Sequence, residues 1–304
     1  MSSARVVLLA GGTGGAKLAR GMLDVVGSEQ FVVIANTADD IEIYGGYVSP
    51  DPDLVTFWLA DLVDERGWGL AGDTFRVMEG LRGLGIEVWF NLGDRDLAIA
   101  LERARALRAG ARLTEAQAAI ANALGVSARV LPMSDKPVRT LVQSHGRWWP
   151  FQEFMIKGGA EGPVDDVQFR GARNARATEE VLEAVATARA IVIGPSNPVI
   201  SIGPILAVPD VHAALAGTPA PVVAVSPVVR GQVLKGPTKT FMEWAGQPLT
   251  STGISAMYTN LIDGLVADEP TDAVPVLETE LLLDSPAARR HVAEQTLRFA
   301  LALG

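Results

Sequence analysis

Two stretches near the start of the chain hold residues whose types and spacing could do phosphate chemistry. Residues 11–15 read Gly-Gly-Thr-Gly-Gly, and four aspartates lie within residues 39–53, at Asp39, Asp40, Asp51 and Asp53. A glycine turn that opens a helix directs backbone N–H groups and the positive end of the helix dipole at one point, which suits a phosphate. Carboxylates beside a phosphate suit Mg²⁺, which prefers one or two carboxylates plus phosphate oxygens and water. The two stretches therefore predict a phosphate-binding site with a divalent cation.

The elements that must position these residues can be read on either side of them. Apolar runs over Val6–Ala10 and Phe31–Ala35 predict two buried strands, and a helix follows the glycines. Ligands of open α/β sheets gather at the carboxyl ends of neighbouring strands, so both loops should face one crevice. A third buried strand at residues 190–194 ends in another polar loop. The predicted phosphate-binding residues are Gly11, Gly12, Thr13, Gly14, Gly15, Asn36, Ser196 and Asn197.

Standard nucleotide fingerprints do not fit the glycine run. A dinucleotide motif beginning at Gly12 would need glycine or alanine at position 17, where Lys17 stands. A Walker A loop would need serine or threonine after that lysine, and Leu18 stands there. A generic phosphate loop remains, and an NAD-dependent dehydrogenase is disfavoured.

The acidic loop over residues 49–53 has two interpretations. Proline holds the residue before it in an extended conformation, so Asp51 and Asp53 could present their carboxylates to the same side. Alternatively, Asp53 is the N-cap of a helix over residues 54–63. Further along, Arg95 lies between two aspartates, and either a surface salt-bridge cluster or a cationic clamp on a substrate explains it.

The rest of the pattern predicts an α/β fold: a Rossmann-like three-layer sandwich with a mainly parallel sheet and an inserted, mostly helical subdomain. Residues 1–55 and 175–304 form the predicted nucleotide-binding core. Residues 56–174 form the predicted insertion on the acceptor-binding side, with a strand at 128–133 and a β-hairpin with strands at 140–144 and 147–154. A helix is expected to begin at residues 72–74, and further strands are expected at 221–225 and 261–266.

Composition excludes several classes of protein. The chain has 304 residues, of which 48% are hydrophobic and 20% charged, and its formal net charge is −9. That charge argues against a nucleic-acid partner. The absence of cysteine excludes disulfides and thiolate metal sites, and the three histidines lack the spacing of zinc ligands. No apolar run approaches the roughly 18 residues of a membrane span, and the N-terminus lacks a signal-peptide pattern, so we expect no membrane partner and a cytoplasmic protein.

Ten sequence blocks in a fixed order resemble those of one known family. They are GGTGGAKL (11–18), NTADD (36–40), SPDPD (49–53), GDTF (72–75), LGDRDLA (92–98), PMSDKPVRT (132–140), FQEF (151–154), IGPSNPVISIGPIL (193–206), VSPVV (225–229) and KGPTK (235–239). Together they are similar to the 2-phospho-L-lactate transferase (CofD-like, FbiA-like) family of coenzyme F-420 biosynthesis. The resemblance covers almost the whole chain.

The resemblance implies a reaction. The family uses a guanosine diphosphate ester of a three-carbon acid. It transfers the phospho-acid to the ribityl hydroxyl of Fo (7,8-didemethyl-8-hydroxy-5-deazariboflavin) and releases GMP, with Mg²⁺ present. Carried over by position, Asp53 and Asn91 contact Fo, although position 91 can be lysine in the family. We hypothesise that Asp40 and Asp51 hold Mg²⁺, while Asp53 orients or deprotonates the attacking hydroxyl. Asp51 and Asp53 are thus the predicted catalytic residues.

Several questions stay open at this level. The acid can be phospholactate, phosphoenolpyruvate or a similar group. A non-catalytic nucleotide-sugar-binding regulator of a sister family, which shares the glycine loop, is the alternative function. We expect the chain to bind its small-molecule substrates and to form a homodimer.

Overall fold

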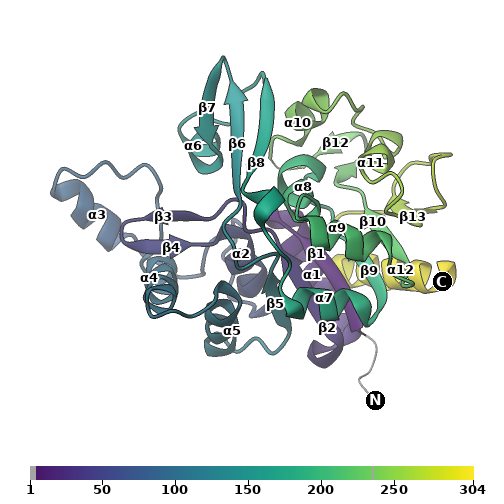
Figure 1. Ribbon diagram of the computed structural model, residues 1–304, viewed down its shortest axis with the longest axis horizontal. Helices are drawn as coiled ribbons and strands as arrows, with labels where there is room; N and C mark the ends of the chain where they lie inside the picture. The colour runs from purple at the N-terminus through teal and green to yellow at the C-terminus, as the bar shows by residue number, and fades with distance from the viewer. Residues whose placement is uncertain (1–4, 235) are drawn as a thin grey trace.

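Seven parallel strands form the centre of the molecule (Figure 1). A computed structural model describes residues 5–234 and 236–304, so that Lys235 of the KGPTK block and the first four residues lie outside the described part. The strand order is β14-β13-β10-β9-β1-β2-β5, and each neighbouring pair is parallel. The bounds are β1 Arg5–Ala10, β2 Phe31–Ala35, β5 Arg129–Pro132, β9 Ala188–Ile193, β10 Val222–Val225, β13 Gly264–Ala267 and β14 Val276–Glu278.

Helices cover both faces of this sheet, which confirms the three-layer α/β prediction. Side chains of β1 alternate between two hydrophobic clusters, with Leu8 in one and Leu9 in the other. Both faces of the strand are therefore buried, as the continuous apolar run predicted. One face packs against α1 (Gly12–Val26), α2 (Pro50–Leu59) and α12 (Pro286–Leu303). The other packs against α7 (Glu179–Ala186), the π-helical turn Pro198–Ile202, α8 (Gly203–Leu206), α9 (Pro209–Ala216) and α11 (Ser251–Met257).

Two excursions leave the sheet between β2 and β9 (Figure 1). The first forms an arm and carries the hairpin β3 (Ile41–Ile43) and β4 (Gly46–Val48), with α3 (Arg76–Gly83), α4 (Asp94–Arg108) and α5 (Leu113–Ala123). The second is a small antiparallel sheet in the order β7-β6-β8, formed by β6 (Arg139–Ser144), β7 (Arg147–Pro150) and β8 (Asp166–Arg170), with α6 (Phe151–Ile156). The remaining elements are η1 (Ser28–Gln30), η2 (Ala172–Asn174), β11 (Val228–Val229), β12 (Gln232–Val233) and α10 (Thr238–Trp244).

The predicted insertion over residues 56–174 is not one continuous body, because β5 returns from it to the central sheet. Val130 and Leu131 are buried there, and β5 pairs with β2 along its length. The second strand of the predicted hairpin is also shorter than expected, since β7 ends at Pro150 and a helix follows. The helix expected near residue 72 begins at Arg76.

The acidic loop folds differently from either interpretation of its sequence. Helix α2 begins at Pro50, with Ser49 at its N-cap, so Asp51 and Asp53 both lie in its first turn. Proline at the first helical position is already set to helical φ, and carboxylates are favourable beside the positive end of the helix dipole. Asp53 is therefore not the N-cap, and the two side chains diverge, as described below.

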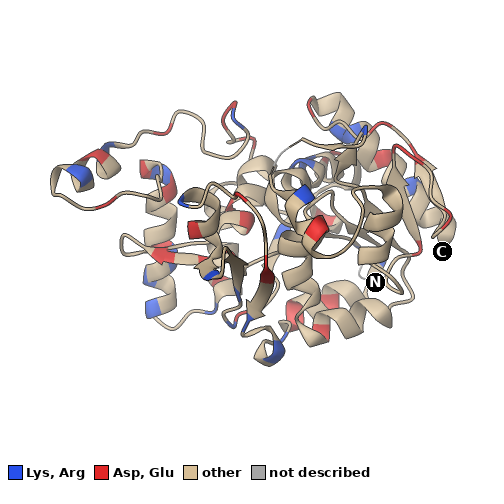
Figure 2. Cartoon of the chain, turned by 90° about the horizontal axis from the view of Figure 1, so that it is seen from above, with Lys and Arg blue, Asp and Glu red and all other residues tan. Residues whose placement is uncertain are grey.

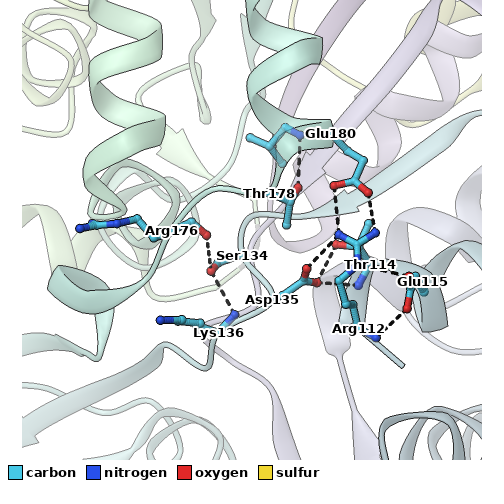
Figure 3. A network of polar contacts seen from close by, with 10 residues as sticks. Arg112, Thr114, Glu115, Ser134, Asp135, Lys136, Arg176, Thr178 and Glu180 are labelled. Atoms are coloured by element: carbon cyan, nitrogen blue, oxygen red, sulfur yellow. Dashed lines mark hydrogen bonds and ion pairs between the residues drawn. The ribbon is translucent and has the colours of Figure 1, made fainter. Parts of the chain in front are cut away.

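A network of ion pairs fastens α5 to the core (Figure 3). The guanidinium of Arg112, at the N-cap of α5, lies 2.7 Å from Glu180 in the first turn of α7 and 3.3 Å from Asp135 after β5. The backbone N–H and the hydroxyl of Thr114 both donate to Asp135, at 2.8 and 2.7 Å. The network therefore joins the arm to elements on both sides of the second excursion.

We expect replacement of Glu180 by glutamine to destabilise the fold only above acidic pH. Hydrogen bonding to Arg112 lowers the pKa of Glu180 from 4.5 to about 2. A carboxyl with a lowered pKa stabilises the fold at pH values above its unfolded pKa, and the contribution is lost as the pH falls through the folded pKa. The Tm of E180Q should be lower than that of the wild type by about 2 °C at neutral pH. The difference should shrink between pH 4.5 and 2.

Thermal unfolding at several pH values measures this effect. Replacement of Glu87, an exposed residue in the loop after α3, by glutamine is the matched control and should leave Tm unchanged. A difference between E180Q and the wild type that is the same at pH 3 and pH 7 would contradict the role of the ion pair.

Within residues 5–234 and 236–304, no single helix has both the length and the apolar composition to cross a membrane; only Pro198–Leu206 and Pro209–Ala216 taken together, across an 89° bend, pass that test.

Candidate active site

A cavity of about 310 Å³ lies at the carboxyl edge of the central sheet. Its walls come from the loops after β1, β2, β9 and β10. The chain runs from β1 to β2 on one side and later continues through β9 and β10 on the other. The strand order thus reverses between β1 and β9, and in open α/β sheets ligands bind at such a point. The topology therefore places the predicted phosphate loop beside the loop that carries Ser196 and Asn197.

The glycine run forms the first turn of α1, with Gly11 as its N-cap. The N–H of Gly12 donates to Oδ1 of Asp51 at 2.6 Å, and the N–H of Gly11 donates to the Ser196 hydroxyl at 3.3 Å. The positive end of α1 is therefore already in contact with a carboxylate of the protein. The predicted residues Gly11, Gly12, Thr13 and Gly14 line the cavity.

Close packing of α1 on the loop after β9 explains two of the glycines. A Cβ on Gly14 would lie 2.0 Å from the carbonyl oxygen of Pro195, and a Cβ on Gly15 would lie 2.7 Å from the Ser196 hydroxyl oxygen. Contacts this short are sterically impossible without backbone movement, so only glycine lets the helix approach. Gly15 is buried in this contact and does not line the cavity, so its role in the structure is packing.

Asn36 brings two carboxylates together. Its side-chain Nδ2 donates to Oδ2 of Asp39 at 3.1 Å and to Oδ2 of Asp51 at 2.9 Å. Asp39 and Asp51 both line the cavity, whereas Asn36 lies behind them. Asp39 Oδ1 and the nearby hydroxyl of Thr140 are buried without a hydrogen bond of ordinary geometry. The pair Asp39–Asp51 therefore keeps acceptor capacity beyond the hydrogen bonds that it makes.

The surroundings of these carboxylates favour a proton or a cation. Burial raises the pKa of Asp39 well above its usual value, and the neighbouring carboxylate of Asp51 raises it further. Burial also raises the pKa of Asp51 to about 6, although hydrogen bonds from Gly12 and Asn36 oppose the change. Two buried carboxylates at close range are unstable together as anions unless a positive charge joins them.

Asp40 and Asp53 lie away from the cavity lining, in a second buried network. Oδ1 of Asp40 accepts a hydrogen bond from the Ser49 hydroxyl at 2.7 Å, and burial raises the pKa of Asp40 to about 7. Asp53 forms an ion pair with Arg103. The structure therefore does not bring Asp40 and Asp51 together as the sequence suggested; Asp39 is the partner of Asp51 on the cavity side.

No cluster of three or more His, Cys, Asp or Glu side chains that could hold a metal occurs in the described part of the chain. A cation at Asp39 and Asp51 would thus need further oxygens from a ligand. Mg²⁺ is commonly bound in this way, by one or two carboxylates together with substrate phosphates and water. The two residues fit that coordination.

Asn91 is exposed on the arm, where its Oδ1 accepts a hydrogen bond from Arg82 at 2.9 Å. It is not among the residues that line the cavity. Arg95 has no ion pair among the described residues and does not line the cavity; its Nη1 donates to the carbonyl oxygen of Ala71 at 2.9 Å. The carboxylate of Asp73 accepts from the N–H groups of Arg95 and Asp96, at 2.9 and 3.2 Å, and so caps α4.

The second excursion also reaches the cavity. Phe151 and Gln152 of α6 line it, and Gln152 Nε2 donates to the carbonyl oxygen of Asp39 at 3.1 Å. Asn197 also lines the cavity and donates to the hydroxyl of Thr238. Thr238 lines the cavity too and, like Phe151 and Gln152, was not predicted as a site residue. These three residues lie in the FQEF and KGPTK blocks, and membership of these blocks was the sequence feature that could have identified them.

Comparisons with known proteins point to one family. The family model for 2-phospho-L-lactate transferase CofD matches residues 6–289. A 2-phospho-L-lactate transferase of Methanosarcina acetivorans is 37% identical over 265 residues, 87% of this chain and 86% of the relative. A phosphoenolpyruvate transferase of Kitasatospora aureofaciens is 37% identical over 311 residues, 95% and 97% of the two chains. A 2-phospho-L-lactate transferase of Methanocaldococcus jannaschii is 34% identical over 305 residues, 97% of both.

Two solved structures of protein BH3568 from Bacillus halodurans share the fold. Their TM-scores are 0.60 and 0.61 at 19% sequence identity, and they cover 97% and 98% of this chain and 99% of theirs. One of them is described as a member of the UPF0052 family. At this identity the likeness concerns the fold alone.

Proposed function

This chain belongs to the 2-phospho-L-lactate transferase family, and we propose on that basis that it transfers a phosphorylated three-carbon acid to Fo with release of GMP. The donor would be a guanosine diphosphate ester of the three-carbon acid itself, so that the phosphate next to the acid is transferred with it as 2-phospho-L-lactate or phosphoenolpyruvate. The observation that supports the proposal best is the pair Asp39–Asp51. Asn36, directly after β2, binds both carboxylates, and both residues line the cavity beside the first turn of α1.

The diphosphate of the donor would lie in the cavity, beside the first turn of α1 and the loop after β9. Thr13 and Gly14 line the cavity in the first turn of α1, and Ser196 and Asn197 line it from the opposite loop. N–H groups in the first turn of a helix have no partner within the helix, so they are suited to phosphate oxygens. Lys17, one turn further along α1, also lines the cavity and can neutralise part of the phosphate charge.

Asp39 and Asp51 would hold Mg²⁺ against the diphosphate. When bound, the ion supplies charge neutralisation on the phosphate oxygens and on the departing GMP. The carboxylates would contribute lone pairs of oxygens that Asn36 and the N–H of Gly12 hold in place. Raised pKa values at Asp39 and Asp51 fit sites that a cation, once present, keeps deprotonated.

The chemical step would be displacement at the phosphorus atom that carries the acid. A new bond forms between the ribityl oxygen of Fo and this phosphorus, and the bond from phosphorus to the bridging oxygen of the diphosphate breaks. The bridging oxygen leaves with GMP. Asp53, which the resemblance assigns to the acceptor, is paired with Arg103 outside the cavity lining, so we propose that it orients the attacking hydroxyl, whose proton passes to water. Such reactions depend on alignment and charge neutralisation more than on covalent catalysis.

A thermal shift experiment tests the donor half of this proposal. We expect GDP with Mg²⁺ to raise Tm, since a ligand at a hundred times its Kd stabilises the folded state by about 2.7 kcal/mol. In D39N the Mg²⁺-dependent part of the shift should be lost, because the pair at the cavity is broken. In D40N it should persist, because Asp40 binds Ser49 away from the cavity. Loss in D40N with retention in D39N would contradict the assignment.

A further inference from the structure

Arg103 is a buried charge that the proposed site does not explain by itself. It lies in α4, and its side chain is 0% exposed. Transfer of an ion from water into a protein interior costs several kcal/mol, and an ion pair offsets this cost only with good geometry and further hydrogen bonds. A fully buried guanidinium therefore indicates a specific function of the contacts it makes.

Both terminal nitrogens of Arg103 bind the Asp53 carboxylate. Nη1 lies 3.0 Å from Oδ2, and Nη2 binds Oδ1 at short range. The two parallel contacts make a bidentate pair, which fixes the plane of the carboxylate as well as its position. Lysine, a point charge on a flexible chain, cannot impose that geometry.

Three other elements hold the guanidinium in place. Nη1 also donates to the carbonyl oxygen of Tyr47 in β4 at 3.0 Å, and Nη2 donates to Oε1 of Gln117 in α5 at 3.1 Å. Gln117 in turn donates to the hydroxyl of Thr56 in α2 at 2.9 Å. Side chains from α4, α5 and α2 and a backbone carbonyl from β4 thus surround one ion pair, so Arg103 is held in the position from which it binds Asp53.

The first turn of α2 connects this ion pair to the cavity. Asp53 lies two residues after Asp51, and nine of the ten residues of α2 are buried. Asp51 is held by Gly12 on the cavity side, whereas Asp53 is held by Arg103 on the arm side. The single helical turn therefore sets a fixed relation between the donor carboxylate and the acceptor carboxylate.

We propose that Arg103 is a positioning residue that orients Asp53 toward the hydroxyl of the acceptor. This inference rests on the proposed function, in which Asp53 contacts Fo. A carboxylate has about four lone-pair positions, so the two contacts with Arg103 and the one from the N–H of Ser49 at 3.4 Å leave capacity for a hydroxyl. Arg103 itself touches neither the cavity lining nor the expected donor site. Its removal should affect the acceptor and spare the donor.

Steady-state kinetics with both substrates varied separately tests the proposal in R103M and R103K. A displacement of about 1 Å in a reacting group can cost about 10²-fold in rate. We expect kcat/KM for Fo to fall about 10²-fold in R103M, with a smaller loss in R103K, while KM for the guanosine diphosphate ester stays within about twofold. The unchanged donor KM also shows that each variant is folded. R105M is the matched control, since Arg105 lies exposed on the same helix and pairs only with Glu102 in the described contacts.

Chemical rescue separates positioning from general stability. In R103A, added guanidinium should restore acceptor turnover more than ammonium at equal concentration, because only guanidinium reproduces the bidentate contact. Equal losses for donor and acceptor in both R103M and R103K, or unchanged kinetics in both, would overturn the positioning role alone. Absence of any transfer to Fo by the wild-type protein would overturn the proposed function, and this inference with it.

Discussion

Replacement of Asp51 by asparagine is expected to lower kcat about 10³-fold. Asp51 faces the cavity, and its carboxylate accepts from the N–H of Gly12 at 2.6 Å and from Asn36 at 2.9 Å. Asparagine keeps the shape but removes the negative charge that would hold a cation on the diphosphate. Loss of one electrostatic contact to a transition state typically costs about 3–4 kcal/mol, equivalent to a factor of 10²–10³.

The E42Q variant is the control that separates the effect of the Asp51 charge in the cavity from the effect of lowering the net negative charge of the region. Glu42 is exposed in β3, so E42Q removes one carboxylate charge from the same region without touching the cavity. Its kcat should equal that of the wild type. Turnover of D51N within tenfold of the wild type would show that Asp51 is not part of the catalytic site.

Replacement of Asp53 by asparagine should cause the largest loss of stability. Arg103 is 0% exposed and the Asp53 side chain is 11% exposed, so the variant leaves a guanidinium in the interior without its counter-ion. Breaking a buried ion pair from one side costs about 3–5 kcal/mol in free energy of unfolding. For a chain of this length we expect Tm to fall by about 10 °C.

The ion pair between Arg20 and Asp61 supplies the matched control for stability. The Asp61 side chain is 67% exposed, and exposed pairs contribute about 0–1 kcal/mol. D61N should therefore change the free energy of unfolding by less than about 1 kcal/mol. Equal effects of D53N and D61N in chemical denaturation would show that Arg103 is not stabilised by Asp53. A double variant, D53L with R103M, should recover part of the loss, since both charges are then absent.

The sequence predicted the central sheet well because its strands are buried on both faces. Such strands are continuous apolar runs, as in Val6–Ala10 and Phe31–Ala35, and the structure has strands at both. Prediction failed for β3, β4 and β14, which are three residues long and carry too little pattern. The segment that became β5 was recognised as a strand, but its pattern does not reveal which strand it pairs with. Assignment of residues 56–174 to one insertion failed for that reason.

Local sequence decides the position of some of the predicted site residues. The glycine turn and Asp51 lie at the cavity, since a strand, a tight turn and a helix must place them at the sheet edge. The choice between Asp39 and Asp40 was not accessible from the sequence, because it depends on Asn36, which binds both Asp39 and Asp51, and on Ser49, whose hydroxyl binds Asp40. Arg103 was missed because its partner lies 50 residues away in the chain, and no local pattern records such a contact.

The most direct test of the central claim is a turnover measurement on the wild-type protein. The protein is incubated with Mg²⁺, Fo and the guanosine diphosphate ester of either lactate or enolpyruvate, and the products are identified by mass spectrometry. We predict that at least one ester yields GMP and a phosphodiester of Fo in equal amounts, and that D51N forms both about 10³-fold more slowly. Binding of the nucleotide without transfer from either ester would contradict the account and would favour a nucleotide-binding regulator on the same fold.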